Sequence, residues 1–306
     1  MEIKKIVKKM RKIKAFRSLE LTVTRPIPSK QLMNIQYALS FKKNIDWENP
    51  KTFNEKLQYI KLFHRDDLYT VAADKIKVKN YIAEKIDESL VIPNLGIWNS
   101  FDEIKFDQLP NQFVLKTNHD YAGVYVCLDK SKMNIPKLRK MFTKHLKTNY
   151  FYPNREWAYK NIPPKIFAEK LLKDDVYEDI IDYKFFAFNG YVDSVMICTE
   201  RFTGNPKFYF FNKEWELLPY NKDSIDAISE KKVIKEPYNM NKMFEIAAKL
   251  SENIPFVRVD LYNVNGHIYF GEMTFYPNGG YDNKLLPVTD LHYGELIDLK
   301  LVKKGK

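Results

Sequence analysis

The sequence predicts an α+β fold in which amphipathic helices are followed by antiparallel hairpins. Apolar residues recur at helical spacing between residues 50 and 88, whereas residues 182–201 and 256–275 alternate in the manner of paired strands. The chain has 306 residues, of which 45% are hydrophobic, and this is enough to bury a substantial core. We therefore expect a globular protein of two or three subdomains.

The two cysteines, Cys127 and Cys198, lie far apart and form no C-x-x-C motif. They indicate neither a disulfide framework nor a zinc site, and they fit a reducing cytoplasm. No stretch approaches the roughly 20 apolar residues that a membrane-spanning helix needs, and the N-terminus lacks the continuous apolar core of a signal peptide. We expect a protein that is neither secreted nor integral to a membrane.

Positive charge is concentrated at the N-terminus. The net charge is +11, but residues 1–30 hold ten Lys and Arg against Glu2 and Glu20, which leaves a net charge of +3 for the other 276 residues. Enzymes that act on nucleic acids usually spread basic charge over a groove of the folded domain. We therefore expect no nucleic-acid partner.

The first 20 residues have the pattern of a basic amphipathic helix. Lys and Arg separate apolar positions that recur at helical spacing, which are Ile3, Ile6, Val7, Met10, Ile13 and Phe16. Such helices bind the interface of anionic membranes. We therefore predict a cytoplasmic protein that is peripheral on the inner face of the plasma membrane. The alternative is an arm that packs on its own domain or is disordered.

Two amphipathic helices are predicted between residues 50 and 88, the second over residues 68–86. Thr52 caps the first of them, because Glu55 follows three residues later in the pattern of a capping box. Lys75 follows Asp74 on the second helix.

Two short strand-like runs at residues 113–116 and 124–128 flank a loop that contains His119 and Gly123. A lysine at the end of a strand, here Lys116, can hold phosphate oxygens together with the N–H groups of a loop of small residues. No P-loop motif occurs in the chain, so a plain hairpin remains the competing interpretation. We expect His119 to be a turn residue rather than a base.

Further along the chain, residues 164–170 have the pattern of a buried strand that leaves the core at Glu169. A hairpin follows over residues 182–201, with Asn189-Gly190 as its turn and Lys184 on its first strand.

The C-terminal hairpin comprises strand-like runs at residues 256–262 and 267–275, joined through Asn265-Gly266. A two-residue Asn-Gly loop would send the side chains of Asp260 and Glu272 to opposite faces of the hairpin.

A type I turn that begins at Asn263 gives a three-residue loop instead, which pairs Asp260 with Phe270 and Arg258 with Glu272. We predict this second turn. One face of the hairpin then carries Arg258, Asp260, Glu272 and Thr274, while the other face is apolar and buried.

Two carboxylates and an arginine on one face can bind a divalent metal and phosphate. Mg²⁺ takes oxygen ligands from one or two carboxylates together with substrate phosphates. The alternative is an ordinary hairpin with a surface Arg–Glu pair, since such pairs are common and weak.

In their linear order, these segments resemble the ATP-grasp superfamily, in particular its TupA-like branch, which is associated with teichuronopeptide and surface-polysaccharide synthesis. The similar segments span roughly residues 50–295 and are TFNEKLQYIKLFHRD, ADKIKVKNYIAEKI, IPNLGIWNSFDEI, QFVLKTNH, KIFAEKLL, DYKFFAFNG, RVDLY and FGEMTFYP. The resemblance implies an ATP-grasp fold, in which two α+β subdomains with antiparallel sheets clasp ATP. We place the basic segment at residues 1–24, a small α+β lobe at 25–110, the small subdomain at 111–172 and the large subdomain with the metal site at 173–306.

The resemblance also implies roles for individual residues. The groups expected to bind ATP are Lys75, Lys116, His119, Gly123, Glu169, Lys170 and Leu172, the last three as a hinge whose main chain reads adenine. Arg258 is similar to the arginine that faces the transferring phosphate, and the expected catalytic set is Arg258, Lys184 and Lys116. The expected Mg²⁺ ligands are Asp260, Glu272, Thr274 and Asn278.

Two positions depart from the pattern of the family. Thr274 stands where many ATP-grasp ligases have Asn, and because a hydroxyl is a weaker metal ligand, Asn278 is a candidate substitute. The loop after His119 reads Asp120-Tyr121-Ala122-Gly123 where Ser-Gly is expected, which alters the cover over the phosphates.

The chemistry implied is carbon–nitrogen ligation with release of ADP. A carboxylate takes the γ-phosphate of ATP to give an acylphosphate, and an amine then displaces phosphate to form an amide. For this branch the expected carboxylate lies on a uronic-acid-containing glycan or its precursor, and the amine is an amino acid or a simple amine. Competing classes are a glycosyltransferase, although no D-x-D triplet occurs in the sequence, and a noncatalytic scaffold of the same pathway.

Overall fold

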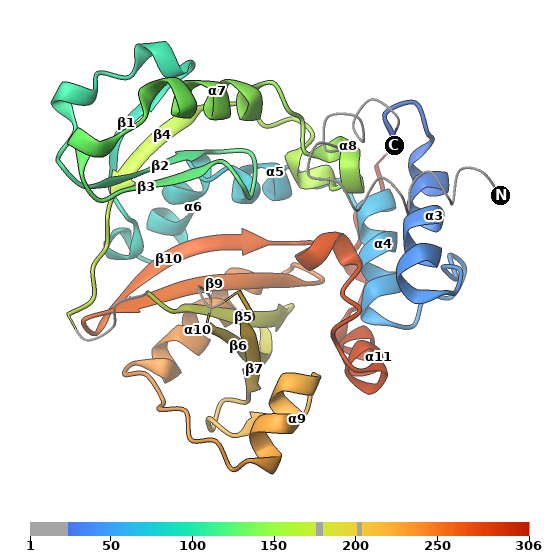
Figure 1. Ribbon diagram of the computed structural model, residues 1–306. Coiled ribbons are helices and arrows are strands. Elements are labelled where there is room, and N and C mark those ends of the chain that lie inside the picture. The colour runs from blue at the N-terminus through green and yellow to red at the C-terminus, as the bar shows by residue number, and fades with distance from the viewer. Residues whose placement is uncertain (1–23, 176–179, 201–203, 306) are drawn as a thin grey trace.

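The computed structural model describes residues 24–175, 180–200 and 204–305 of the chain. Two antiparallel sheets lie one above the other, and helices cover their outer sides and close one end (Figure 1). The basic segment predicted at the N-terminus lies outside the described residues. None of the helices within these ranges could span a bilayer.

The helices are α3 (Ser29–Phe41), α4 (Phe53–Phe63), α5 (Asp67–Ala73), α6 (Lys77–Lys85), α7 (Ile135–Leu146), α8 (Phe151–Asn154), α9 (Lys222–Ser229), α10 (Met240–Ser251) and α11 (Pro287–Leu296). The strands are β1 (Asn94–Trp98), β2 (Phe113–Thr117), β3 (Val124–Cys127), β4 (Ile166–Lys170), β5 (Asp182–Phe188), β6 (Tyr191–Thr199), β7 (Lys207–Phe211), β8 (Leu217–Leu218), β9 (Val257–Val264) and β10 (His267–Thr274). Two 3₁₀ turns matter for the site, η6 (Trp157–Tyr159) and η7 (Pro277–Gly280).

The N-terminal helices begin as the sequence predicts and then break once more than expected. Thr52 and Glu55 form the predicted capping box at the start of α4. The single helix predicted over residues 68–86 is interrupted, because the Asp74 side chain accepts hydrogen bonds from the N–H groups of Ile76 and Lys77 and starts α6 anew. The break leaves Lys75 between α5 and α6, where its side chain can reach the space between the sheets.

The smaller sheet has the strand order β1-β4-β2-β3. Alternate residues of its strands pack under α7 in a separate core, which includes Phe113, Leu115, Cys127, Phe142 and Ile166. The residues between them therefore point the other way, toward the larger sheet.

The larger sheet has the order β10-β9-β5-β6-β7-β8. The predicted Asn189-Gly190 turn joins β5 to β6, and both residues have positive φ, 48° and 88°. Helix α10 covers the outer face, where the Phe185 and Phe244 rings lie 5.1 Å apart and edge-on. The other face of β5, β9 and β10 is directed at the smaller sheet.

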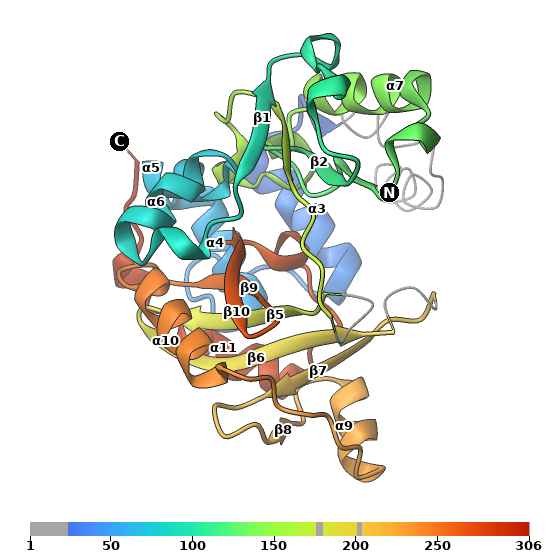
Figure 2. The same cartoon turned by 90° about the vertical axis from the view of Figure 1, so that its left-hand side faces the viewer.

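Helices α4 and α11 close one end of the molecule, and Figure 2 shows α3 and α4 behind the space between the two sheets. Phe53 of α4 packs edge-on against Phe256 and Tyr293 of the larger core. On the next turns of α4, Gln58 Nε2 donates to the Gly280 carbonyl and Lys61 Nζ to the Gly279 carbonyl, each at 2.6 Å. These bonds fix the η7 turn directly after β10.

Candidate active site

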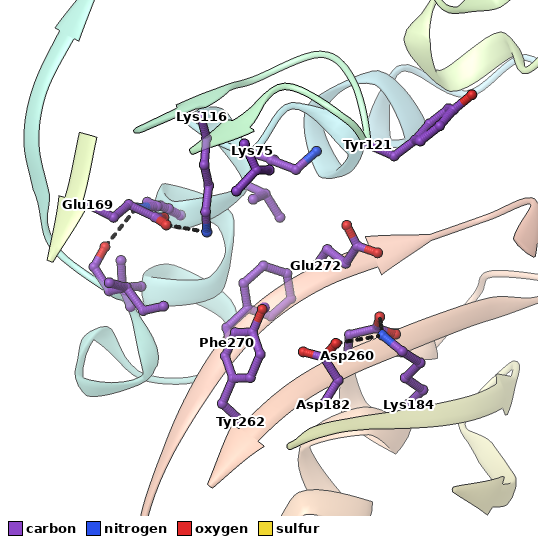
Figure 3. A pocket seen from close by; sticks show the side chains of 16 residues that line it. Lys75, Lys116, Tyr121, Glu169, Asp182, Lys184, Asp260, Tyr262, Phe270 and Glu272 are labelled. Carbon is purple, nitrogen blue, oxygen red and sulfur yellow. Dashed lines mark hydrogen bonds and ion pairs between the residues drawn. The ribbon is translucent and has the colours of Figure 1, made fainter. Parts of the chain in front are cut away.

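The cavity between the two sheets measures about 300 Å³, and half of the residues that line it are charged (Figure 3). The charged residues are Lys75, Lys79, Lys116, Glu169, Asp182, Lys184, Asp260 and Glu272. Cations lie on both walls, and most of the carboxylates lie on the larger sheet. This arrangement suits a ligand with several negative charges and a metal ion.

The turn of the C-terminal hairpin differs from the prediction. Val264 pairs with His267, and Asn265 and Gly266 both have positive φ, 52° and 77°. The hairpin therefore has a two-residue Asn-Gly loop, and the predicted three-residue loop is wrong.

A β-bulge at Gly271 nevertheless brings the acidic residues to one face. Phe270 pairs with Leu261, but Glu272 pairs with Asp260, so Gly271 is an extra residue in β10. The shift by one residue reverses the facing pattern of the rest of the strand. Glu272 thus lies directly opposite Asp260, and Thr274 rather than Glu272 pairs with Arg258.

We expect Gly271→Ala to lower the thermal unfolding midpoint by several degrees. A Cβ at this position would lie 2.9 Å from the Asp260 carbonyl oxygen and 3.1 Å from the Tyr262 ring, and the backbone atom cannot move aside without disturbing the bulge. Overpacking of this kind costs about 1–3 kcal/mol. Differential scanning fluorimetry measures the effect, with Val233→Ala, at a side chain that is 93% exposed, as the control. An unchanged midpoint would show that the bulge accepts a side chain.

Arg258 joins the acidic pair into one network. Its Nε donates to Asp260 Oδ1 at 2.6 Å, and its Nη2 reaches Asp260 Oδ2 at 2.7 Å and Glu272 Oε1 at 3.0 Å. Nη2 also donates to Thr274 Oγ1 at 3.1 Å. Lys184 Nζ lies 2.5 Å from Asp260 Oδ2. The side chains of the predicted face therefore form a single charged cluster.

The two carboxyl groups have different electrostatic environments. Burial raises the pKa of Glu272, but Lys75, Arg258 and Lys184 together lower it to about 2. Burial raises the pKa of Asp260, and Arg258 and Lys184 oppose this effect. Glu272 is therefore ionised at any physiological pH, with Lys75 acting on it from across the cavity.

On the side of the cavity formed by the smaller sheet and α6, Glu169 forms ion pairs with two lysines. Glu169 is 5% exposed, and its carboxylate lies 2.5 Å from Lys116 Nζ and 2.6 Å from Lys79 Nζ. Burial raises the pKa of Glu169, but the two ammonium groups lower it further, so the net shift is downward. The strand predicted to leave the core at Glu169 thus still holds this side chain inside the cavity.

The loop after β2 is organised by Asp120, which the sequence interpretation did not use. Its Oδ1 accepts hydrogen bonds from the N–H groups of Ala122 and Gly123 at 3.0 and 2.7 Å, and its Oδ2 lies 2.7 Å from His145 Nδ1. Lys75 Nζ donates to the Asp120 carbonyl. The departure from Ser-Gly therefore places a carboxylate on two N–H groups that the sequence interpretation had assigned to phosphate.

Some of the predicted site residues line the cavity, whereas His119, Lys170 and Leu172 do not. Those that line the cavity are Lys75, Lys116, Glu169, Lys184, Asp260 and Glu272. His119 is buried at 2% exposure, with its ring nitrogens 3.3 Å from Asn118 Oδ1 and 3.1 Å from the His145 carbonyl, as expected of a turn residue. Lys170 ends β4 and is exposed, and Leu172 follows it.

Arg258 of β9 and Asn278 of η7 lie beside this cavity rather than in its lining. Both line an adjoining cavity of about 370 Å³, which also includes Lys184. Thr274 lines a third cavity, together with Arg258, Glu272 and Asn278. The predicted catalytic and metal-binding residues therefore line three cavities that share residues with one another.

Lys79 and Asp182 are cavity residues that the sequence interpretation missed. Lys79 follows Lys75 by four residues in a helical pattern, and Asp182 precedes Lys184 by two in a strand, so their spacing placed each on the same side as a predicted residue. That spacing was the available signal. The spacing did not predict that Lys79 pairs with Glu169 of β4.

The donors present fit a magnesium ion that shares its coordination with phosphate. Within the described ranges no three His, Cys, Asp or Glu gather into a metal site of their own. Two carboxylates suffice where substrate phosphates supply further oxygens. The hydrogen bonds from described residues to the Glu272 carboxylate all go to Oε1, and its side chain is 36% exposed, so Oε2 suits a cation in the cavity.

Similar solved structures include two D-alanine–D-alanine ligases. The enzyme from Bacillus anthracis has 16% sequence identity and a TM-score of 0.43, with 78% of this chain and 69% of that chain covered. The enzyme from Helicobacter pylori has 13% identity and a TM-score of 0.44, with coverages of 82% and 68%. The ATP-grasp ligase PsnB, complexed with a minimal precursor, has 9% identity and a TM-score of 0.41, with coverages of 75% and 61%. Among curated proteins, no sequence matches this chain.

A family model gives the decisive match. The model of the TupA-like ATPgrasp family matches residues 55–298, which is most of the chain and contains both sheets and every cavity residue named above. The segments from which the resemblance was inferred lie within or next to this range. The chain belongs to the TupA-like ATP-grasp family.

Proposed function

We propose that this protein is an ATP-dependent ligase that joins a carboxylate to an amine through an acylphosphate. The observation that carries the proposal is the pair Asp260 and Glu272 on one face, bridged by Arg258, in a cavity that is also lined by Lys116 of the smaller sheet and by Lys75 and Lys79. Transfer of a phosphoryl group needs charge neutralisation and positioning rather than a covalent protein nucleophile. The products are ADP, phosphate and an amide.

In this proposal the two sides of the cavity bind different parts of Mg-ATP. Lys75, Lys116 and Lys79 contact the phosphate chain of ATP, and adenine lies against the main chain of Lys170 and Leu172. Arg258 and Lys184 face the transferring phosphate. Asp260 and Glu272 hold Mg²⁺, with the oxygens of Thr274 and Asn278 as further donors. Bound Mg²⁺ neutralises charge that develops on the phosphate oxygens.

We propose further that the carboxylate belongs to a uronic-acid-containing surface polysaccharide or its precursor. The 370 Å³ cavity beside Lys184 and Arg258 supports this, because its apolar lining includes Phe186, Phe208 and Phe210. Aromatic rings pack well against the C–H faces of sugar rings. Lys284, with its Nζ 5.1 Å from the Phe208 ring centre, offers a cation at the same cavity.

A screen of ADP release tests the function. Purified protein is incubated with Mg-ATP and pairs drawn from a panel of uronic acids and amines, and ADP is measured by a coupled assay. We expect ADP release that depends on both members of a pair, and an amide product of matching mass. Release of ADP that needs only water would indicate an ATPase. In a parallel incubation with sugar nucleotides and no ATP, consumption of the sugar nucleotide would indicate the glycosyltransferase alternative.

We infer that the protein works at an anionic membrane surface. The basic amphipathic pattern of residues 1–20 supports this. Helix α7 adds three exposed lysines at spacings of three and four, Lys137, Lys140 and Lys144, and contains no Asp or Glu; the exposed Lys147 directly follows it. The described chain begins at Thr24, whose carbonyl accepts a hydrogen bond from Arg155, shortly after α7 in the chain.

Vesicle sedimentation should separate the contributions of arm and helix. We expect the intact protein to pellet with vesicles that contain phosphatidylglycerol but not with phosphatidylcholine alone, and rising salt to release it. Loss of residues 1–20, or Ile6→Asp with Met10→Asp, should abolish pelleting. Changing Lys137, Lys140 and Lys144 to Gln should weaken it, since each basic residue near the surface contributes about 1 kcal/mol.

The matched control changes three exposed lysines elsewhere, Lys222, Lys231 and Lys235, to Gln, so that net charge falls equally. If this control weakened pelleting as much as the α7 variant, net charge rather than a membrane-facing surface would be responsible. If the truncated protein pelleted like the intact one, the arm would be a packing element.

A further inference from the structure

A third cavity, of about 420 Å³, adjoins the aromatic one. It is lined by polar side chains, among them Asn154, Glu156, Tyr159, Glu272 and Asn278. Arg258 and Asn278 line this cavity and the aromatic one, so a group bound in either lies beside the same guanidinium. A ligase that joins two substrates needs two such approaches to one reacting centre.

Glu156 is the carboxylate of this cavity that the proposed ATP and metal sites do not use. It is 7% exposed and lies between α8 and η6. Among the residues that the structure describes, one hydrogen bond reaches its carboxylate, from Asn154 Nδ2 to Oε1 at 3.1 Å. A buried carboxylate with so few partners is costly unless a ligand completes its surroundings.

The segment around Glu156 is held rigidly. Arg155, in the left-handed region at φ 58°, donates from Nη2 to the carbonyls of Thr24 and Ile27 at 2.6 and 2.8 Å. Lys61 Nζ donates to the Asn154 carbonyl at 2.9 Å and to Gly279. Glu156 therefore has a fixed place at the cavity wall.

Electrostatics make Glu156 a stronger base than an ordinary carboxylate. Burial raises its pKa to about 7, while the charge of Lys61 opposes this rise. Burial likewise lowers the pKa of Lys61 to about 7. The titratable and charged groups around the cavity are Lys61 from α4, Arg155 beside it, Tyr159 on η6, Tyr276 after β10, Tyr121 from the β2–β3 loop, and Arg258 and Glu272 from the larger sheet.

An amine needs such a base before it can attack an acylphosphate, because at neutral pH it is largely an ammonium ion without a free electron pair. We propose that this cavity binds the amine substrate and that Glu156 accepts a proton from its ammonium group, an inference that rests on the proposed ligase function. The other carboxylate of the cavity, Glu272, is a poorer base with its pKa of about 2. A general base works best when its pKa lies near the operating pH.

The step balances in atoms and charge. The ammonium group gives one proton to Glu156, and the freed nitrogen pair attacks the carbonyl carbon of the acylphosphate. The carbon–nitrogen bond forms, and the bond from carbon to the phosphate oxygen breaks. The departing phosphate takes the second proton from nitrogen and leaves as hydrogen phosphate, so that one hydrogen remains on the amide. Glu156 returns its proton to water.

Hydroxylamine separates this step from the ones before it, because it is largely unprotonated at neutral pH and needs no base. We expect Glu156→Gln, which keeps the acceptor for Asn154, to form hydroxamate from a uronic acid, Mg-ATP and hydroxylamine at the rate of the wild type. With glycinamide as the amine, the same variant should form amide roughly tenfold more slowly at pH 7, because an α-amino group with a pKa near 8 is about nine-tenths ammonium at that pH. The exposed Glu245→Gln serves as the control and should leave both rates unchanged.

The pH profile of amide formation gives a readout that a merely structural role would not move. Because Glu156 must be ionised to accept a proton, the wild-type rate should fall as pH drops below about 7. Lys61→Met removes the charge that opposes the raised pKa of Glu156, so the fall in rate on the acidic side should begin at a higher pH. Hydroxamate formation should not show this fall in rate on the acidic side.

Equal loss of hydroxamate and amide in Glu156→Gln would overturn the proposal, as would amide formation at the wild-type rate. If the wild type formed neither product, the proposed function would be at fault for these substrates. Binding of glycinamide, followed by ligand-observed NMR, would then decide the present point. Binding by the wild type that is lost in Glu156→Gln supports the amine site, and equal or absent binding in both overturns it.

Discussion

Replacing Glu272 by Gln is expected to cut ADP release by roughly 10²–10³-fold, the loss typical of removing one electrostatic group from a site that stabilises developing charge. The fold should survive, because the side chain is 36% exposed and Gln can still accept hydrogen bonds from Arg258 and Thr274. The change removes the ionised oxygen proposed to bind Mg²⁺. ADP release and the thermal shift produced by Mg-ATP are the two measurements.

Asp260→Asn should show the same loss of turnover together with a loss of stability. Asp260 is 2% exposed and accepts hydrogen bonds from both Arg258 and Lys184. Arg258 keeps Glu272 and Lys184 keeps Asp182 as counter-ions, so the loss should be smaller than the roughly 3–5 kcal/mol typical of breaking an isolated buried ion pair. Comparison of the two variants therefore separates chemistry from folding.

The exposed Glu245→Gln on α10 is the matched control, since it removes a carboxylate from a surface pair with Lys242. The metal-site proposal would be wrong if Mg-ATP failed to stabilise the wild type. It would also be wrong if Mg-ATP stabilised both site variants as strongly as it stabilises the wild type.

The same-face placement of Asp260 and Glu272 could be predicted, but its cause could not. Alternation along a strand determines which face a side chain points to only where the pairing of the two strands is regular. One extra residue is needed to bring Glu272 to the face of Asp260, and the prediction placed that residue in the turn. The chain places it at Gly271 instead, where a glycine inside a strand was the visible signal of a bulge. Two different offsets give one facing pattern, and sequence periodicity alone does not distinguish them.

Contacts between distant segments account for the remaining differences. Lys79 lies on α6 and its partner Glu169 on β4, and nothing local to either residue specifies the other. Asp120 likewise meets His145 at the end of α7, so the changed loop is tied down by a residue 25 positions away. The single-helix prediction over residues 68–86 failed because the Asp74 side chain satisfies two N–H groups outside the helix that precedes it.

Lys116→Met should weaken Mg-ATP binding by roughly ten- to hundredfold. A charge-assisted hydrogen bond to phosphate contributes about 1.5–3 kcal/mol, and each 1.4 kcal/mol is a factor of ten in affinity. Stability should change little, because Glu169 keeps Lys79 at 2.6 Å as its counter-ion. Isothermal titration with a non-hydrolysable ATP analogue and Mg²⁺ measures the affinity, and Lys132→Met, whose side chain is 82% exposed in the same subdomain, is the control.

The ion pairs of Glu169 also predict what the partner of Lys116 does. Glu169→Gln would leave the ammonium groups of Lys79 and Lys116 without their carboxylate, so ATP phosphates should compensate the charge and bind at least as tightly while the unliganded protein loses stability. Opposite effects of the two variants on affinity would place the phosphates against the lysines. A wild-type affinity in Lys116→Met would instead leave the lysine as a structural partner of Glu169, and the phosphate-binding role would then fall to Lys75 and Lys79 at the same cavity.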